Sequence, residues 1–387
     1  MRNAFVIGSV LLLLAAVGCA SGGNKQVAEG TEDGGAGTIR DSRGFDRSMG
    51  PAEIAYQSAQ QFLAAGNYDE AIGHLRTATS LKPTYIEAWN DLGSTLTKIK
   101  DYQGGIAAYE RALALQPDNL ILMQAIGYNY LAIENLDKAE EYYSKVVQRD
   151  TLSYEGNRNL AFIYQKKNDA DQAIKYYLVA LRAQPSDATT MGTLATLYEK
   201  KGDEAKKVEY LRMAVAAAPD NFNFKRLLGA AYMKDKDFVN AAPIFEELVK
   251  NYPDQPLYHQ NLGLIYSQIP ERRADAVREL EETVKLKGND SYVCGILAKM
   301  YNDVQQYEKA IDAAKRGLAA TGGGQEALLN YQWGYALSKL GQYDEATVQF
   351  EKVVATKDAA WLEAAKKEIA RQAALKKRAA AAKEQQQ

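Results

Sequence analysis

The sequence predicts an all-α protein built as a solenoid, in which about nine helix–turn–helix units stack and a C-terminal helix caps the last one. One period of 34 residues runs through most of the chain, and each period holds two stretches with the helical spacing of apolar residues. The composition agrees, because 47% hydrophobic and 25% charged residues in a chain of 387 are typical of a folded protein.

Three residue types keep the period. Tyr, Ala and Pro each recur at intervals close to 34 residues or to twice that number, and the alanine position is taken by Gly105 in one unit and by Lys207 in another. The tyrosines are Tyr130, Tyr164, Tyr198, Tyr232, Tyr266 and, after 35 residues, Tyr301. The alanines are Ala71, Ala139, Ala173, Ala241, Ala276, Ala310 and Ala346, and the prolines are Pro83, Pro117, Pro185, Pro219 and Pro253. Three residue types in one register are the pattern of a repeat protein.

Each unit contains two amphipathic helices. In one unit the first stripe runs through Trp89, Leu92 and Leu96, at i, i+3 and i+7, and a second stripe follows between Ile106 and Leu113. Pro117 ends the second helix because proline cannot continue it. Small residues recur where we expect the two helices of a unit to approach closely: Gly93, Gly127, Ala161, Ala195, Gly229, Gly263, Ala298 and Gly334.

These motifs resemble the tetratricopeptide repeat family. The family's spacing is matched by Trp89, Leu92, Gly93, Tyr109, Ala112 and Pro117, and again by Leu228, Gly229, Tyr232, Phe238, Ala241, Phe245 and Pro253. The resemblance implies a right-handed α-solenoid of about nine tetratricopeptide repeats over residues 52–360, at 52–85, 86–119, 120–153, 154–187, 188–221, 222–255, 256–290, 291–324 and 327–360. The matched residues are structural, so they indicate the fold and say little about function.

Three irregular places and the C-terminus complete the repeat region. Pro270 predicts a longer turn, Pro243 predicts that its helix begins late, near Asn240, and residues 321–324 form a glycine-rich break. Residues 361–387 begin with an amphipathic stripe that includes Trp361, and we expect it to cap the solenoid. The basic, alanine-rich end at residues 376–378 is typical of a solvated, fraying tail.

The N-terminus carries a targeting signal. The apolar run from Ala4 to Ala16 is too short to span a bilayer comfortably and predicts a secretory signal. Small residues before Cys19 resemble the bacterial lipoprotein signal, which implies a signal peptide at 1–18, a lipid on Cys19 and a flexible Gly-rich tether over 19–51. Ala20 resembles the class sorted to the outer membrane, facing the periplasm. An ordinary cleavable signal with an incidental cysteine is the alternative.

The residues offer little for catalysis. There is no Gly-rich phosphate loop and no nucleophile elbow. His74 and His259 lie in different units, and Cys294 has the pattern of a small buried residue. A net charge of -2 argues against a nucleic-acid partner. We therefore expect no enzyme activity, no cofactor, no metal and no small-molecule substrate.

The candidate binding site is a groove. The family resemblance implies that the first helices line a concave surface that binds extended peptides or helices. The core stripe leaves the following residues facing it: Tyr56, Gln57, Gln60, Asn90, Asp91, Ser94, Gln124, Tyr128, Arg158, Asn159, Phe162, Thr193, Thr196, Arg226, Lys234, Gln260, Asn261, Tyr331, Gln332 and Tyr335. Amides can bond a peptide backbone, and tyrosines add contact area at low entropy cost. Arg158 with Asn159 resembles the family's carboxylate clamp only faintly, because its partner lysines are not in register in the next unit.

The sequence thus predicts a membrane-anchored scaffold of the bacterial cell envelope that binds other envelope proteins. Assembly of a pilus, a secretion channel or an outer-membrane complex is the role that the resemblance implies for such lipoproteins. A binding module for an envelope polymer, such as exported polysaccharide or peptidoglycan, is the main alternative, and an enzyme is a third.

Overall fold

The structure is a computed structural model that describes residues 49–320 and 324–384. Within these ranges the regular secondary structure consists of 19 α-helices and one short 3-10 helix, which confirms the all-α prediction. The signal peptide predicted for 1–18, Cys19, the tether up to residue 48 and most of the glycine-rich break lie outside the described residues. None of the described helices is both long enough and apolar enough to cross a bilayer.

The chain divides into two compact units, and the first ends at Pro83. It contains one antiparallel pair, α1 (Pro51–Ala64) and α2 (Tyr68–Leu81). Ala59, Ala71 and Leu75 are fully buried between the two helices. The pair therefore forms a small core of its own.

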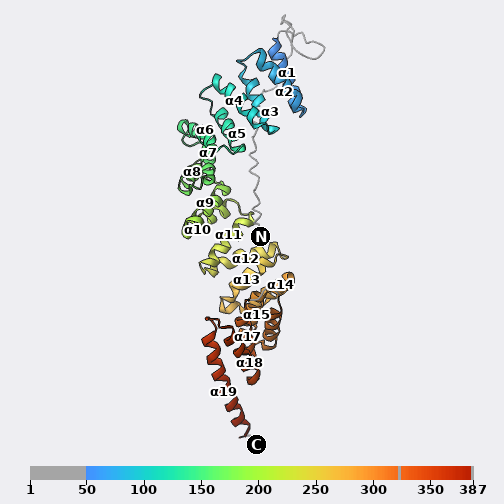
Figure 1. Cartoon of the computed structure of the whole chain (residues 1–387), viewed down its shortest axis with the longest axis vertical. Coiled ribbons are helices and arrows are strands. Elements are labelled where there is room, and N and C mark those ends of the chain that lie inside the picture. Colours follow the sequence, from blue (N-terminus) through green and yellow to red (C-terminus); the bar gives the residue numbers. More distant parts are fainter. Residues whose placement is uncertain (1–48, 321–323, 385–387) are drawn as a thin grey trace, which may run out of the picture. The chain divides into compact units, whose positions relative to one another are not determined.

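The second unit, from residue 84 on, holds eight further helix pairs and a terminal helix (Figure 1). Within this unit, each helix contacts the helices next to it in the chain, as a repeat architecture requires. The pairs are α3 (Ile86–Lys98) and α4 (Tyr102–Leu115), α5 (Leu120–Ala132) and α6 (Leu136–Arg149), α7 (Tyr154–Lys166) and α8 (Ala170–Ala183), α9 (Ala188–Lys201) and α10 (Glu204–Ala217), α11 (Phe222–Lys234) and α12 (Phe238–Asn251), α13 (Pro256–Ser267) and α14 (Arg273–Lys287), α15 (Ser291–Asp303) and α16 (Tyr307–Ala319), and α17 (Glu326–Lys339) and α18 (Tyr343–Thr356).

In eight of the nine described pairs the turn holds a residue in the left-handed region, and the pair α13–α14 is the exception. Lys100, Glu134 and Lys236 occupy it with φ near +60°, and Gly202 stands at the same place of another pair. The residue after the turn is mostly Asp or Asn, whose side chain caps the second helix. Asp101, for example, accepts a hydrogen bond from the backbone N–H three residues on, at 3.0 Å. Turn and cap together set where each second helix begins.

The small residues lie where the two helices of a pair touch, as predicted. A methyl group built on Gly127 would come within 2.8 Å of the ring of Tyr143, and one on Gly229 within 2.7 Å of the ring of Phe245. Both rings are buried. Glycine therefore allows a large aromatic side chain of the second helix to lie directly against the backbone of the first.

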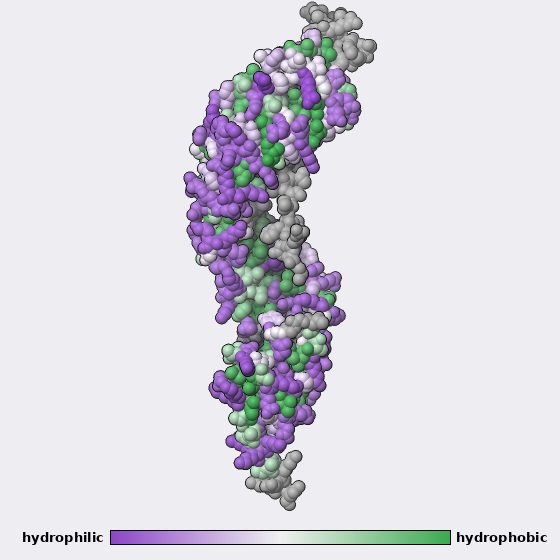
Figure 2. Space-filling view, in the orientation of Figure 1, coloured by the Kyte–Doolittle hydropathy of each residue, from purple (hydrophilic) through white to green (hydrophobic). Residues whose placement is uncertain are grey.

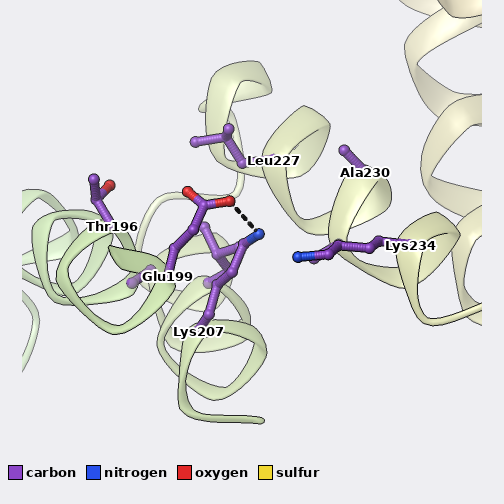
Figure 3. A pocket seen from close by; sticks show the side chains of 9 residues that line it. Thr196, Glu199, Lys207, Leu227, Ala230 and Lys234 are labelled. Atoms are coloured by element: carbon purple, nitrogen blue, oxygen red, sulfur yellow. Dashed lines mark hydrogen bonds and ion pairs between the residues drawn. The ribbon is translucent and has the colours of Figure 1, made fainter. Parts of the chain in front are cut away.

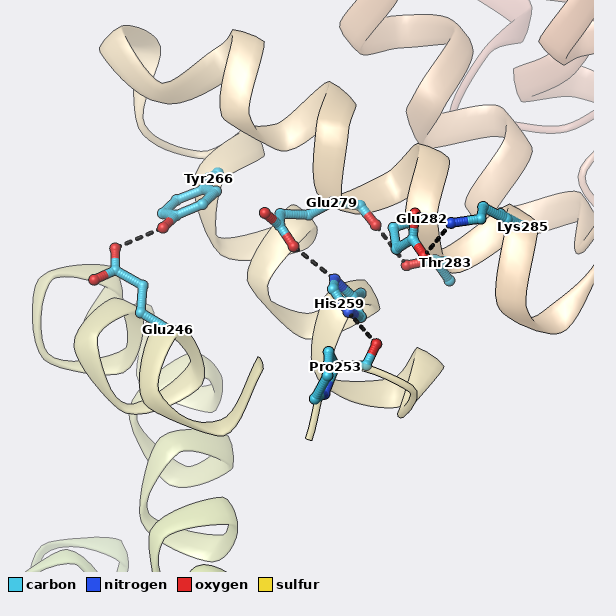
Figure 4. A network of polar contacts seen from close by, with 8 residues as sticks. All are labelled: Glu246, Pro253, His259, Tyr266, Glu279, Glu282, Thr283 and Lys285. Atoms are coloured by element: carbon cyan, nitrogen blue, oxygen red, sulfur yellow. Dashed lines mark hydrogen bonds and ion pairs between the residues drawn. The ribbon is translucent and has the colours of Figure 1, made fainter. Parts of the chain in front are cut away.

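Periodic tyrosines connect successive pairs. The rings of Tyr164 and Tyr176 stack at 5.5 Å, and the Tyr164 hydroxyl donates a 2.6 Å hydrogen bond to Glu140 of the preceding pair. That hydrogen bond, together with burial, holds the pKa of Tyr164 above its ordinary value. The same arrangement recurs where Tyr266 donates to Glu246 at 2.5 Å (Figure 4). The periodic spacing of the tyrosines thus places one polar link at several junctions between units.

One predicted irregularity is wrong and another is confirmed. The helix that contains Pro243 does not begin late, since α12 starts at Phe238 like the other second helices, with Asp237 as its cap. The proline leaves the carbonyl of Val239 without its helical donor, but Val239 is 80% exposed, so water can reach that end of the helix. Pro270 does begin a longer turn, the 3-10 helix η1 (Pro270–Arg272).

The C-terminal helix α19 (Leu362–Glu384) packs against the last pair, as predicted for a cap. Ala365 is fully buried, and the ring of Trp361 lies 4.8 Å from that of Tyr331. The expected fraying tail differs from the structure, because the helix continues through the basic cluster. Lys376 forms an ion pair with Asp344 of α18 at 2.6 Å, which holds this part of the helix near the repeat.

The histidine and the cysteine that drew attention in the sequence are buried. His259 lies between Glu279 of α14, 2.7 Å from Nδ1, and the carbonyl of Pro253, 2.8 Å from Nε2 (Figure 4). Cys294 is fully buried, as predicted, and burial raises the pKa of its thiol. In the ranges that the structure describes, no three His, Cys, Asp or Glu side chains gather as metal ligands would.

Candidate functional site

The first helices share an exposed face. In several of them, two positions four residues apart lie on one side and outside the core stripe, whereas in α9 and α15 the first of these positions is a buried glycine, Gly192 and Gly295. Those in α3, α5 and α7 are occupied by Asn90 and Ser94, by Gln124 and Tyr128, and by Arg158 and Phe162. We call the exposed side chains at these positions, with their neighbours on the same helices of the second unit, the first-helix surface.

The structure places the residues predicted for the groove on the outside of the first helices, with one exception. All thirteen of the following are at least partly exposed: Tyr56, Gln60, Asn90, Ser94, Gln124, Tyr128, Arg158, Asn159, Phe162, Arg226, Gln260, Asn261 and Tyr335. Tyr56 and Gln60 belong to the first compact unit and the others to the second. Gln332 was expected among them, but it is buried and accepts a hydrogen bond from Asn302 at 3.1 Å.

Two neighbouring first helices are joined at their N-terminal ends. The hydroxyl of Tyr154 in α7 donates a 2.7 Å hydrogen bond to Asp187, the cap of α9. Burial, aided by the carboxylate of Asp187, raises the pKa of Tyr154 to about 12. The guanidinium of Arg158 lies 6.0 Å from the Tyr154 ring. The contact with the Tyr154 ring thus positions the positive charge of Arg158 at the edge of the first-helix surface.

Aromatic rings on this surface are paired with lysines one turn further on. Lys166 lies 5.4 Å from the centre of the Phe162 ring, and Lys339 lies 5.3 Å from that of Tyr335. Phe162 is 37% exposed although it is wholly apolar. Exposed contacts of this type contribute about 0.5–1 kcal/mol each, so they orient these side chains without burying them.

One concave pocket opens on the first-helix surface, between α9, α10 and α11. It has a volume of about 260 Å³ (Figure 3). Its mouth is formed by exposed residues of α9 and α11, and its floor by buried residues of α9, α10 and α11. The lining residues are Ala195, Thr196, Glu199, Lys207, Leu211, Leu227, Ala230, Ala231 and Lys234.

Lys207 in the floor stands where most other units have alanine. Its ammonium group lies 2.6 Å from Glu199 and 3.3 Å from Glu204. Burial alone would lower the pKa of Lys207, but the two carboxylates outweigh it and hold the pKa above its ordinary value. Glu204 also pairs with Lys234, which raises the number of charges that meet at this end of the pocket to four.

The pocket was only partly predictable from the sequence. Thr196 and Lys234 were expected on the surface, whereas Glu199, Leu227 and Ala230 were not. The interruption of the alanine series at Lys207 was the signal that could have pointed to it, because a long side chain cannot fit where alanine packs two helices together.

Hydrophilic and hydrophobic side chains separate over this part of the second unit. Hydrophilic side chains dominate the edge over α6, α8 and α10, whereas hydrophobic ones show in the recess over α11 (Figure 2).

The charges of the first helices are unevenly distributed. The helices α7, α9 and α11 together carry seven Lys and Arg but only two Glu. By contrast, α5 and α13 carry no Asp, Glu, Lys or Arg, and α15 and α17 carry one of each sign. The chain as a whole has a net charge of -2. The positive part of the first-helix surface therefore coincides with the helices on either side of the pocket.

Comparison with known families identifies the repeat. Models described as tetratricopeptide repeat match residues 56–119, 125–188, 193–256 and 327–358, which together make up more than half of the chain. A relative, the protein ycf37 of Guillardia theta, which is described as uncharacterized, is 32% identical over 100 residues. That match covers 24% of this chain and 56% of the relative, so the chain spans only about half of its length.

Solved structures with a similar fold have lower identity. A tetratricopeptide repeat protein from Parabacteroides merdae is 12% identical, with 74% of this chain and 98% of that one covered and a TM-score of 0.43. PilF of Pseudomonas aeruginosa is 20% identical, with 54% and 94% covered and a TM-score of 0.43. MamA of Desulfovibrio magneticus is 19% identical, with 45% and 98% covered and a TM-score of 0.42. Likenesses of this degree carry no statement about function.

Proposed function

Since the chain belongs to the tetratricopeptide repeat family, whose repeats serve as scaffolds for protein–protein interaction, we propose that its first-helix surface binds segments of partner proteins. A repeat array of this kind offers an extended surface rather than a closed active site. The partners we propose are other proteins of the bacterial cell envelope.

The observation that carries this proposal is the pattern of exposure along the first helices. Amide and aromatic side chains such as Gln124, Tyr128 and Asn159 are partly exposed at equivalent or adjacent positions of successive units. Amides can bond both the donors and the acceptors of a peptide backbone, and tyrosines supply area with few rotatable bonds. The pocket adds a concave feature of the size that one side chain requires.

The finer part of the proposal concerns location. We propose that Cys19 carries a lipid and that the repeats act next to a membrane, namely the outer membrane on its periplasmic side. The support is in the sequence, where the apolar run from Ala4 to Ala16 ends in small residues before Cys19. The proposed role there is assembly of an envelope machine, such as a pilus, a secretion channel or an outer-membrane complex.

Co-purification from detergent-solubilised envelopes tests the binding role. The bait is the full chain, compared with a variant that carries Tyr128→Ala, Arg158→Glu and Asn159→Ala. We expect the variant to keep its helicity and to lose at least one partner. The control is Arg212→Glu, an exposed charge reversal on the second helix α10, which should keep every partner.

The outcomes separate the alternatives. Equal recovery of all partners by both baits would place binding outside the first-helix surface. Retention of binding after protease treatment of the partner extract would indicate an envelope polymer instead of a protein. The location is tested separately with Cys19→Ser: wild type should incorporate a labelled fatty acid and sediment with outer-membrane fractions, and the variant should do neither. An unlabelled wild type would contradict the lipid anchor alone.

A further inference from the structure

We propose that the pocket between α9, α10 and α11 receives one apolar side chain from an acidic segment of a partner protein. The inference rests on the proposed function and names the chemistry of the partner at one place on the first-helix surface. It follows from the pocket's shape, from the residue that creates it and from the charges around it.

The pocket has an apolar floor beneath an open mouth. Leu211, Ala195 and Ala231 are at most 2% exposed and form its apolar walls with Leu227, which is labelled in Figure 3. Ala230 lies exposed at the mouth, at the position where α5 has Tyr128. A small side chain at this position leaves the entrance open.

Lys207 explains why the pocket occurs in this unit. In the units before and after, the equivalent residues Ala173 and Ala241 are fully buried where helices meet. Lys207 needs more room, and its ammonium group is held by Glu199 on α9 and Glu204 on α10. Its aliphatic stem then belongs to the floor, because such stems pack like apolar side chains while the charged end is held elsewhere.

The volume fits one apolar side chain. A dry cavity of roughly 150 Å³ lined by apolar residues suffices for benzene, so about 260 Å³ accommodates a leucine, methionine or phenylalanine side chain. The charged groups of this pocket are those of Lys207, Glu199 and Lys234, and the hydroxyl of Thr196 donates its hydrogen bond to the carbonyl of Gly192 in its own helix. The remaining lining side chains are apolar and offer no partner for a polar side chain, and burying one against them without a hydrogen bond is costly.

The surrounding charges favour an acidic segment. Of the seven basic residues on α7, α9 and α11, three are paired with carboxylates of second helices, namely Lys201, Lys225 and Lys234. Among the described residues, neither Lys166 nor Lys200 forms an ion pair, and both are exposed. A partner with Asp or Glu on either side of its apolar residue would meet these cations, whereas a basic partner would be repelled.

Selection from a random-peptide display library tests the inference with the full chain as target. We expect the enriched peptides to carry one aliphatic or aromatic residue flanked by Asp or Glu. A synthetic peptide of the enriched sequence, followed by fluorescence anisotropy, should lose about tenfold or more in affinity when its apolar residue becomes serine. Its binding should also weaken as salt is added, because the charges are exposed.

Two variants connect that preference to the pocket. Ala230→Trp fills the mouth from the exposed side of α11, so it should abolish the apolar preference and leave helicity unchanged. Lys200→Glu should weaken binding of the acidic peptide and keep the preference for an apolar over a serine residue. Thr196→Phe, on the opposite side of the mouth, is a second way to fill the pocket if the tryptophan variant folds poorly.

Several results would overturn the inference. These are enrichment of basic or wholly polar peptides, failure to enrich any peptide, and an unchanged preference in both filled variants. A change in oligomeric state on Ala230→Trp, measured by light scattering, would assign the pocket to a second copy of this chain instead. If co-purification still depends on Tyr128, Arg158 and Asn159 in any of these cases, the proposed function stands and only the pocket's role fails.

Discussion

Replacing a helical glycine by alanine should have opposite effects at two places in this protein. The first is Gly127→Ala in α5, and the second is Gly73→Ala in α2. A methyl group at Gly127 would lie 2.8 Å from the ring of Tyr143, whereas one at Gly73 would meet nothing within 4 Å. Both glycines are helical, so the backbone effect is the same in the two variants.

The expected free energies follow from these contacts. Alanine favours a helix over glycine by about 0.5–1 kcal/mol, which is the whole effect expected for Gly73→Ala. At Gly127 the new contact is about 1 Å shorter than a normal carbon–carbon contact. The Tyr143 ring is only 1% exposed, so it is enclosed by its neighbours. Overpacking of this kind costs about 1–3 kcal/mol, so Gly127→Ala should be less stable than wild type by up to about 2.5 kcal/mol.

Urea unfolding of the full chain, followed by circular dichroism, gives the overall sign. Because a repeat array need not unfold in one step, hydrogen exchange of peptides from α5 and α6, and separately from α1 and α2, gives the local change. The double variant Gly127→Ala with Tyr143→Leu is the control, since the smaller side chain should recover part of the loss. A Gly127→Ala protein as stable as Gly73→Ala would refute the view that close approach explains the periodic small residues.

Three further predictions concern stability. His259→Leu and Glu279→Leu should each lower the free energy of unfolding by about 1–3 kcal/mol, because each leaves the other side chain without its partner, and the double variant should lose less than the sum. Urea titration of wild type and the three variants measures this coupling, and strict additivity would contradict the prediction. Lys236→Gly should stabilise the protein by about 0.5–1 kcal/mol, because Lys236 has φ 58°, a conformation that glycine adopts at lower cost than lysine. Slower hydrogen exchange in α11 and α12 is the expected result, and faster exchange would be inconsistent with strain in that turn. Burial raises the pKa of Tyr109 from 10.0 to about 12, so the unfolded chain loses this proton first, and the free energy of unfolding falls by about 2 kcal/mol for this one group as pH rises from 10 to 12. Tyrosinate absorbance and loss of helicity should appear together, and full ionisation of an intact helical protein would contradict this prediction.

Most of the fold could be predicted because its signals are local and repeated. The period of Tyr, Ala and Pro and the stripes such as Trp89 to Leu96 depend on helix geometry, which is the same in every unit. The prediction that the helix with Pro243 begins late was wrong because it used a local signal alone. A proline is read as a helix boundary, but here the helix cap at Asp237 and the burial of Phe245 kept the helix intact.

The candidate site could be predicted only in outline. Helical periodicity separates the core stripe from the outer face, and the residues that it predicts outside the core, such as Tyr128 and Arg158, are partly exposed. It could not show that Gln332, four residues before Ala336 on the same helix, is turned inward toward Asn302. Which neighbour a side chain meets depends on the adjacent unit, and that information is not contained in the spacing within one helix.

The sequence by itself determined the repeat, the helix pairs and the surface on which partners are proposed to bind, because a 34-residue period leaves little freedom in how helices of fixed length pack. Only the tertiary structure revealed the pocket. It required α9, α10 and α11 to come together around Lys207, with Glu199 and Glu204 holding its charge. A cavity is a property of the space between elements, and its volume depends on how three helices settle around one oversized side chain.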